Sequence, residues 1–101
     1  TTTKDLISRI MSKAFKVVST YRNFNNLVGL PLTLLNARKG HEFAVLEMGM
    51  NRPGEIERLS SIARPYIGII TNICAAHLEG LGDLEAVARE KAALFQAIDQ
   101  N

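Results

Sequence analysis

Three polar residues stand where the surrounding pattern is apolar, and each could take part in metal or phosphate chemistry. Glu47 ends the apolar run FAVLE, His77 follows the segment TNICAA, and Lys91 interrupts a helical stripe of apolar residues. Phosphoryl-transfer proteins use a carboxylate at a strand end to hold Mg²⁺, a hard cation that prefers oxygen ligands. A carboxylate at this place could also simply face water, so the pattern alone leaves both interpretations of Glu47 open.

Lys91 is the most informative of the three because of its position in the last helical segment. The apolar period of that segment requires an apolar residue at position 91. One explanation is a lysine whose stem packs on the core while its amine reaches water. The other is a partly buried amine that is easily neutralised and reacts with carbon dioxide to give a carbamate, an anionic oxygen ligand. His77 could bind metal through a neutral ring nitrogen, or be a loop histidine bonded to backbone.

Two further polar stretches lie where elements begin. The run TTTKDL opens a helical pattern, and such runs usually stand at the start of a helix that follows a phosphate-binding loop. The run NFNN (23–26) lies between an expected strand and an expected helix. Its asparagines suit turns and helix caps, and a binding loop at this edge would need the same residues. The two interpretations of these asparagines are not exclusive.

The elements that must position these residues alternate between helix and strand. Helical spacing and end signals predict helices over 3–15, 31–37, 55–63 and 83–98, the last of them capped by Asp83. Short apolar or β-branched runs predict strands over 16–20, 42–48 and 66–71. In the first helix, the apolar residues follow helical spacing: Leu6, Ile7, Ile10, Met11 and Ala14.

This alternation predicts an α/β fold with three layers, in which a mainly parallel sheet carries helices on both faces. Ligands of such sheets bind at the carboxyl ends of the strands. Glu47 lies at the end of one expected strand and His77 follows another, so the sequence places its unusual polar residues at that edge.

Composition narrows the class of protein. The 101 residues suit one domain, and 47% hydrophobic with 22% charged residues is the balance of a soluble globular protein. A net charge of +2 is too weak to indicate a nucleic-acid partner. No segment approaches the roughly 20 apolar residues of a membrane span, so we expect no membrane partner. The single Cys74 cannot form an internal disulfide, which favours a reducing, cytoplasmic setting.

Five stretches of the chain, in this order, resemble the central domain of the Mur ligases. They are TTTK, NFNNLVGLPLTLL, FAVLEMGMNRPGEI, ARPYIGIITNICAAHLEGLG and AREKAALF. Together they cover nearly the whole chain. The stretches NFNNLVGLPLTLL and EMGMNRPGEI are most similar to the member that adds a dipeptide, and TNICAAHLE follows a pattern shared more widely. The resemblance implies the ATP-binding central domain, whose fold is similar to that of P-loop NTPases.

The resemblance also implies an activity in peptidoglycan biosynthesis, and hence in building the cell wall. Mur ligases join an amino acid or dipeptide to a UDP-linked muramoyl peptide. ATP first phosphorylates the terminal carboxylate of the precursor, and the amine of D-alanyl-D-alanine then attacks the acyl phosphate. The implied cofactors are ATP and Mg²⁺, because magnesium offsets charge on the transferring phosphoryl group.

The family's site residues can be carried over where the motifs match. Thr1 matches the last threonine of the family's Gly-Lys-Thr phosphate loop, which serves magnesium and phosphate, and Thr2 matches the next position at the helix N-terminus. Glu47 matches the magnesium glutamate, and His77 matches the histidine of a second metal. Lys91 matches a carbamylated lysine, in agreement with its place in the apolar stripe.

Asn25 and Asn26 fall in the family's substrate-side asparagine loop. The sequence also departs from the family pattern near the site. Arg22 stands where glycine is frequent, and Cys74 and Ala75 replace a usual glycine and a usually polar residue before His77. None of these changes removes a matched ligand.

Several parts of the family pattern have no counterpart in these 101 residues: the first strand, the glycine loop with its lysine, the UDP-binding N-terminal domain and the C-terminal domain. We therefore expect residues 1–101 to be a partial central domain that is inactive alone and self-associates through an open sheet edge. The alternatives are another Mur or folylpolyglutamate-type ligase, or a non-catalytic interaction module on the same fold.

Overall fold

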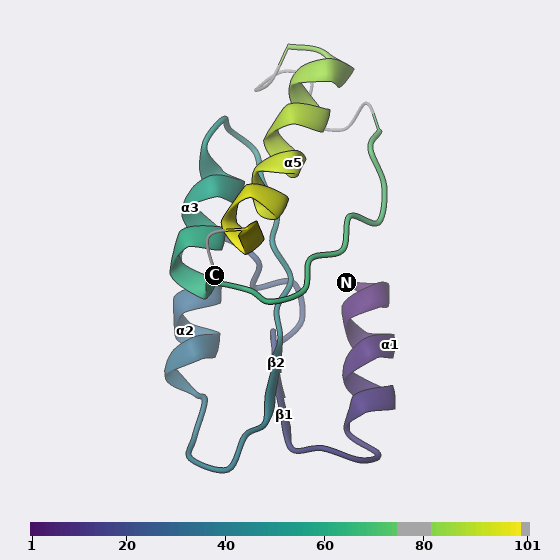
Figure 1. Ribbon diagram of the computed structural model, residues 1–101, viewed down its shortest axis with the longest axis vertical. Coiled ribbons are helices and arrows are strands. Elements are labelled where there is room, and N and C mark those ends of the chain that lie inside the picture. The colour runs from purple at the N-terminus through teal and green to yellow at the C-terminus, as the bar shows by residue number, and fades with distance from the viewer. Residues whose placement is uncertain (75–81, 100–101) are drawn as a thin grey trace. The chain divides into compact units, whose positions relative to one another are not determined.

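The computed structural model describes residues 1–74 and 82–99 (Figure 1). The chain divides into two units, Thr1–Met48 and Gly49–Asn101, and each is described by itself. His77 lies outside the described residues. No helix in the described ranges combines the length and the apolar character needed to cross a bilayer.

The first unit contains a parallel pair of strands with helices beside it. Its elements are α1 (Thr2–Met11), β1 (Val17–Ser19), α2 (Gly29–Leu35) and β2 (Phe43–Val45). Val17 pairs with Phe43, and Ser19 pairs with Val45. The strands can run parallel because α2 forms the crossover between them. α1 packs against both strands, and Figure 1 shows α2 on the other side of the pair, so the predicted layers are present in this unit.

α1 buries only part of the apolar positions that show its helical spacing. Leu6 and Ile10 are 56% and 71% exposed, whereas Lys4 is buried and Ile7 and Met11 are half-buried. Positions 4, 7 and 11 are spaced three and four residues apart and therefore lie on one side of the helix. A lysine, and not a leucine, therefore occupies the first core position of α1.

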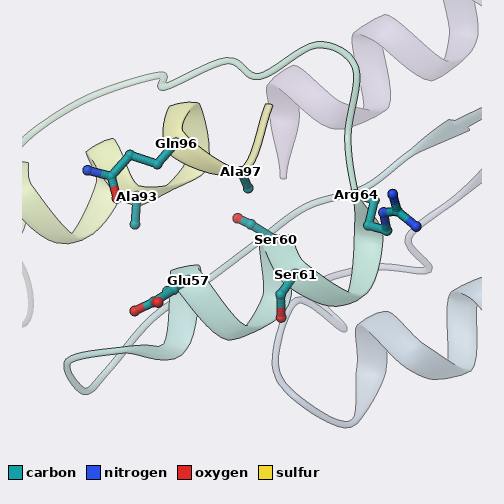
Figure 2. A pocket seen from close by; sticks show the side chains of 7 residues that line it. All are labelled: Glu57, Ser60, Ser61, Arg64, Ala93, Gln96 and Ala97. Atoms are coloured by element: carbon teal, nitrogen blue, oxygen red, sulfur yellow. The ribbon is translucent and has the colours of Figure 1, made fainter. Parts of the chain in front are cut away.

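The second unit is built on two helices, α3 (Glu55–Ala63) and α5 (Leu84–Asp99). They pack against each other around the buried side chains of Ile56, Leu59 and Val87. The carboxylate of Asp83 accepts a hydrogen bond from the Ala86 N–H at 2.7 Å, which confirms the predicted cap of α5. The two helices do not pack closely along their whole length, because a cavity of about 240 Å³ lies between their C-terminal halves (Figure 2).

The third predicted strand, over 66–71, was wrong for this structure. Among the described residues this segment pairs with no strand, and Tyr66 and Ile67 are 86% and 79% exposed. Apolar β-branched residues favour an extended chain, but a strand also needs a partner for its backbone groups. The segment instead runs against α5, since a Cβ added to Gly68 would lie 2.7 Å from Cδ1 of Ile98.

Candidate functional site

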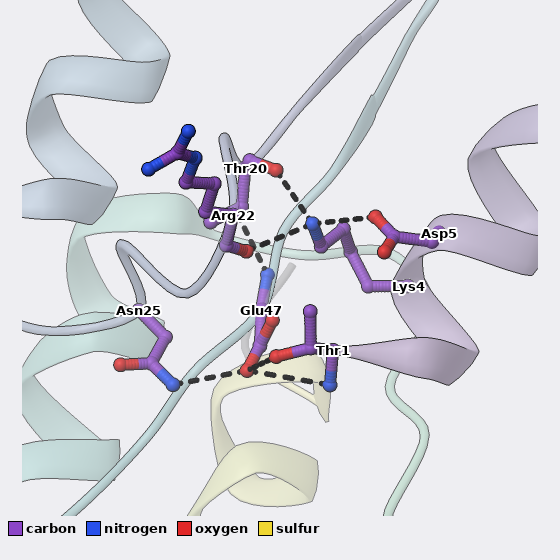
Figure 3. A network of polar contacts seen from close by, with 7 residues as sticks. All are labelled: Thr1, Lys4, Asp5, Thr20, Arg22, Asn25 and Glu47. Atoms are coloured by element: carbon purple, nitrogen blue, oxygen red, sulfur yellow. Dashed lines mark hydrogen bonds and ion pairs between the residues drawn. The ribbon is translucent and has the colours of Figure 1, made fainter.

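Glu47 lies two residues beyond β2, and its side chain is 16% exposed. One carboxylate oxygen, Oε1, accepts hydrogen bonds from Thr1 Oγ1 at 2.9 Å and from Asn25 Nδ2 at 3.0 Å (Figure 3). The amino nitrogen of Thr1 lies 3.4 Å from the same oxygen. The start of α1, the loop after β1 and the end of β2 thus meet at one carboxylate, at the strand edge where the sequence predicts a site.

The second oxygen of Glu47 is different. Oε2 is buried and has no hydrogen-bond partner among the described residues. A buried carboxylate oxygen without a partner is costly, and a bound cation would satisfy it. Carboxylate and hydroxyl oxygens, as in Glu47 and Thr1, are the hard ligands that Mg²⁺ prefers. The residues present therefore fit a magnesium ion. No three His, Cys, Asp or Glu side chains cluster in the described ranges, so water or phosphate would supply further ligands.

Lys4 connects α1 to the end of β1. Its ammonium donates hydrogen bonds to the carbonyls of Thr20 at 2.7 Å and Arg22 at 2.9 Å, and to the Asp5 carboxylate at 2.7 Å (Figure 3). Only 5% of the Lys4 side chain is exposed, so these three acceptors replace water. The hydrogen bond from Lys4, together with its charge, lowers the pKa of Asp5. Arg22 has φ +50°, in the left-handed region that glycine adopts without strain.

Thr20 links the hydrogen bonds of Lys4 to Glu47, the candidate metal ligand. It is 1% exposed, and its hydroxyl accepts a hydrogen bond from the Glu47 N–H at 2.9 Å. Its own N–H donates to the Val45 carbonyl at 3.1 Å. Lys4 and Thr20 therefore fix the backbone from which the Glu47 side chain projects. We did not predict either residue from the sequence, although Lys4 shares a helix face with apolar residues, the same signal that singled out Lys91.

The two predicted asparagines have different roles in the structure. Asn25 contacts Glu47, whereas the Asn26 side-chain oxygen accepts hydrogen bonds from the N–H groups of Val28 at 3.1 Å and Gly29 at 2.7 Å. Asn26 thus forms the turn that begins α2, as its turn chemistry predicts. The loop folds back tightly, because a Cβ on Gly29 would clash with the carbonyl oxygen of Phe24.

Lys91 belongs to the second unit and is half-buried, as expected for a lysine inside an apolar stripe. Its ammonium donates a hydrogen bond to the backbone carbonyl of Asn72. Thr2 is the first residue of α1 and is exposed. Of the predicted site residues, the structure therefore brings together Thr1, Asn25 and Glu47.

Comparison with known proteins supports the relationship indicated by the motifs. The family model of the Mur ligase middle domain matches residues 1–101. The UDP-N-acetylmuramoyl-tripeptide–D-alanyl-D-alanine ligase of Bacillus subtilis (strain 168) is 43% identical over 101 residues, all of this chain. The ligase of the same name from Escherichia coli (strain K12) is 38% identical over the same length. The chain spans about a fifth, 22%, of the length of each of these curated relatives.

Solved structures give the same result. MurF from Acinetobacter baumannii matches with a TM-score of 0.93 and 39% identity, over 97% of this chain and 22% of that one. The MurF ligase from Thermotoga maritima, solved in complex with ADP, matches with a TM-score of 0.89 and 37% identity, over 99% of this chain and 23% of that one. The predicted α/β class is confirmed, and the chain belongs to the Mur ligase family, whose middle domain it matches along all of its 101 residues.

Proposed function

We propose that this chain forms part of the ATP-binding domain of a ligase that adds D-alanyl-D-alanine to a UDP-N-acetylmuramoyl-tripeptide. The observation that carries the proposal is the Glu47 carboxylate, which meets Thr1 at the strand edge and leaves Oε2 without a partner among the described residues. The named function of the two relatives, each matched along this whole chain, supports the choice of substrates. Because both ATP and the UDP-linked precursor are nucleotides of the cell interior, we propose a cytoplasmic reaction.

The proposed reaction requires activation of a carboxylate. The carboxylate of the tripeptide is a poor electrophile until a phosphoryl group from ATP is attached to it. The amine of D-alanyl-D-alanine can then attack the carbonyl carbon, and phosphate leaves. Magnesium, when bound, supplies positive charge against the transferring phosphoryl oxygens. Glu47 would hold the ion through Oε2, and Thr1 would hold it through Oγ1. Asn25 keeps the carboxylate in place by donating to its other oxygen.

The remaining site residues enter the proposal through their place in the fold or through the family match. Thr2 lies at the N-terminus of α1, where free N–H groups and the helix dipole favour a phosphate. Lys91 is proposed as a carbamylated ligand and His77 as a ligand of a second metal, both from the family match. Asn26 is proposed to shape the substrate-side loop, because its hydrogen bonds fix the start of α2.

A chimera tests the proposal. The 101 matching residues of the Bacillus subtilis ligase are replaced by this chain, and ADP release is measured with the UDP-tripeptide and D-alanyl-D-alanine. We expect release that needs both substrates and that falls about a hundredfold in Glu47→Gln. Lys39→Gln, on an exposed loop, is the matched control and should not change the rate.

A second chimera that carries the corresponding Escherichia coli segment shows whether the scaffold accepts an exchanged domain. If that chimera is active while a folded chimera with this chain releases no ADP, the ligase proposal is wrong. A non-catalytic module on the Mur ligase fold would then be the better interpretation.

We also propose that the 101-residue chain self-associates. Within the described ranges β1 and β2 pair only with each other, so each strand has an outer edge whose N–H and C=O groups could pair with a second copy. Light scattering should show a mass that rises with concentration. A folded monomer at all concentrations would contradict this proposal and leave the ligase proposal untouched.

A further inference from the structure

The N-terminus of α3 has no capping side chain of its own. Its N-cap residue is Gly54, with φ +86°, and a glycine offers no oxygen to the first N–H groups of the helix. A residue of α5 supplies both acceptors. Glu90 Oε2 accepts from the Gly54 N–H at 3.0 Å, and Glu90 Oε1 accepts from the Ile56 N–H at 3.1 Å. The carboxylate also lies at the positive end of the α3 dipole.

The turn before α3 is held by a second carboxylate. Glu55 Oε2 accepts hydrogen bonds from the backbone N–H groups of Asn51 and Arg52, the latter at 3.0 Å. Hydrogen bonds therefore join the turn to the first residue of α3. Glu90 links this turn and the start of α3 to α5, through the N–H groups of Gly54 and Ile56.

α5 contacts two other parts of the second unit, and residues that are adjacent in its sequence contact different parts. Glu90, Ala93 and Ala97 face α3, as their contacts with Gly54 and with the cavity between the helices indicate. Lys91 and Ile98 instead face the chain segment 66–74. Lys91 donates to the Asn72 carbonyl, and Ile98 lies against Gly68. Adjacent residues of a helix differ by about 100° in direction. A rotation of α5 that removed Glu90 from α3 would also move the Lys91 ammonium away from Asn72.

Side-chain packing constrains this rotation only in part. Leu59 and Val87 are fully buried, but an open pocket lies between the C-terminal halves of α3 and α5 (Figure 2), lined by Glu57, Ser60, Ser61, Arg64, Ala93, Gln96 and Ala97. Incomplete packing at this pocket leaves α5 room to rotate, whereas two hydrogen bonds to one carboxylate resist rotation.

We propose that Glu90 is a positioning residue: by capping α3 from α5 it fixes the rotation of α5 and with it the place of the Lys91 amine at the Asn72 carbonyl. The importance of this for catalysis rests on the proposed function, in which Lys91 is a ligand. The geometric part of the inference depends only on contacts within the second unit.

Competitive acetylation of the 101-residue chain tests the inference. A trace of acetic anhydride is added, and mass spectrometry gives the reaction rate of Lys91 relative to exposed Lys39 in the same molecule. We expect the relative rate to rise about fivefold in Glu90→Ala, which loses both caps, and less in Glu90→Gln, which keeps one acceptor oxygen. Asp83→Ala is the matched control, because it removes a single cap of α5 while Glu90 stays in place.

Each possible result of the acetylation experiment either supports or overturns the inference. An unchanged Lys91 rate in Glu90→Ala, or an equal rise in Asp83→Ala, overturns the inference. If buried Lys4 also becomes reactive in Glu90→Ala, that variant has unfolded, and Glu90→Gln decides: a rise at Lys91 alone supports the inference and no rise overturns it. The proposed function is tested separately by Lys91→Ala in the active chimera, where full ADP release would refute the ligand role of Lys91 without affecting the acetylation result.

Discussion

Glu47 in the first unit and Glu90 in the second use their carboxylates in opposite ways. Each Glu90 oxygen accepts one backbone N–H, so both oxygens are occupied by the protein itself. The two side-chain donors of Glu47 converge on Oε1 and leave Oε2 buried without a partner in the described ranges. A carboxylate that only holds the fold together is expected to have both oxygens occupied, as in Glu90. A carboxylate that binds a ligand is expected to keep an oxygen available, as proposed for Glu47.

Lys4 and Lys91, the two lysines that share a helix face with apolar residues, also differ in burial and in the acceptors that they contact. Lys4 is buried and donates to three acceptors, which is the full donor capacity of an ammonium. Lys91 is half-buried and donates to the Asn72 carbonyl. Stability should therefore depend strongly on Lys4, and reactivity should be a property of Lys91.

The largest expected effect is that of Lys4→Met. The change keeps an apolar stem but removes the ammonium, which leaves the buried carbonyl of Thr20 and the part-buried carbonyl of Arg22 without their donor. We expect the free energy of unfolding to fall by about 3 kcal/mol, measured by urea denaturation. Lys13→Met, at an exposed position after α1, should cost almost nothing. A loss below about 1 kcal/mol for Lys4→Met would show that the network is not a stabilising element.

The next largest effect compares the two glutamates directly. Glu90→Gln should lower the free energy of unfolding by about 1 kcal/mol, since one helix cap and the favourable charge are lost. Glu47→Gln should leave it unchanged or raise it by up to about 1 kcal/mol without metal, because a buried charged oxygen becomes neutral. Thermal unfolding in the presence of a chelator measures both. Equal losses in the two variants would remove the distinction between the two carboxylates.

Two arginines with positive φ, one in each unit, give a smaller comparison. Arg64 ends α3 with φ +48°, and Arg22 follows β1 with φ +50°. Arg64→Gly should stabilise the chain by about 1 kcal/mol, because glycine adopts this conformation without strain. Arg22→Gly should gain less, since it also removes the contact of the guanidinium with the Tyr21 ring, 5.1 Å from its centroid. Calorimetric melting curves give both gains, and equal gains in the two variants would show that the ring contact has no effect.

The order of helices was predictable from the sequence, because helix signals are local. The predicted bounds of α3 agree with the structure, and Asp83 caps α5 as its residue type suggests. The segment 66–71 was not predictable in the same way. Its residues favour a strand, but pairing depends on a neighbouring strand, and in the described residues the segment contacts α5 instead.

Some residues of the candidate site were predictable from the sequence, and one that supports it, Thr20, was not. Glu47 could be found because a carboxylate after an apolar strand is unusual, and Thr1 and Asn25 because they resemble a family motif. Thr20 could not, since a threonine ending a strand is ordinary, and its importance comes from a hydrogen bond to a residue 27 positions away. Asn26 shows the reverse case: its local turn chemistry predicted its contacts correctly.

The smallest expected effect concerns Asp5, the exposed acceptor of the Lys4 network. The hydrogen bond from Lys4 lowers the pKa of Asp5 in the folded chain. Its contribution to stability is therefore fully present above the unfolded pKa, about 4, and is lost as the pH falls through the lower folded value. Asp5→Asn should flatten the decline of the melting temperature between about pH 4 and pH 2, and leave the curve above pH 5 nearly parallel to that of the wild type.

The matched variant for this measurement is Glu85→Gln, which breaks the exposed Glu85–Arg89 pair of α5, 3.7 Å apart. An exposed pair on one helix should change the acid limb little. If Asp5→Asn also leaves the acid limb unchanged, the two carbonyl acceptors alone hold Lys4, and Asp5 adds nothing to the network. The difference between the units would then lie entirely in the backbone groups used: carbonyls that accept from a lysine in the first unit, and N–H groups that donate to a glutamate in the second.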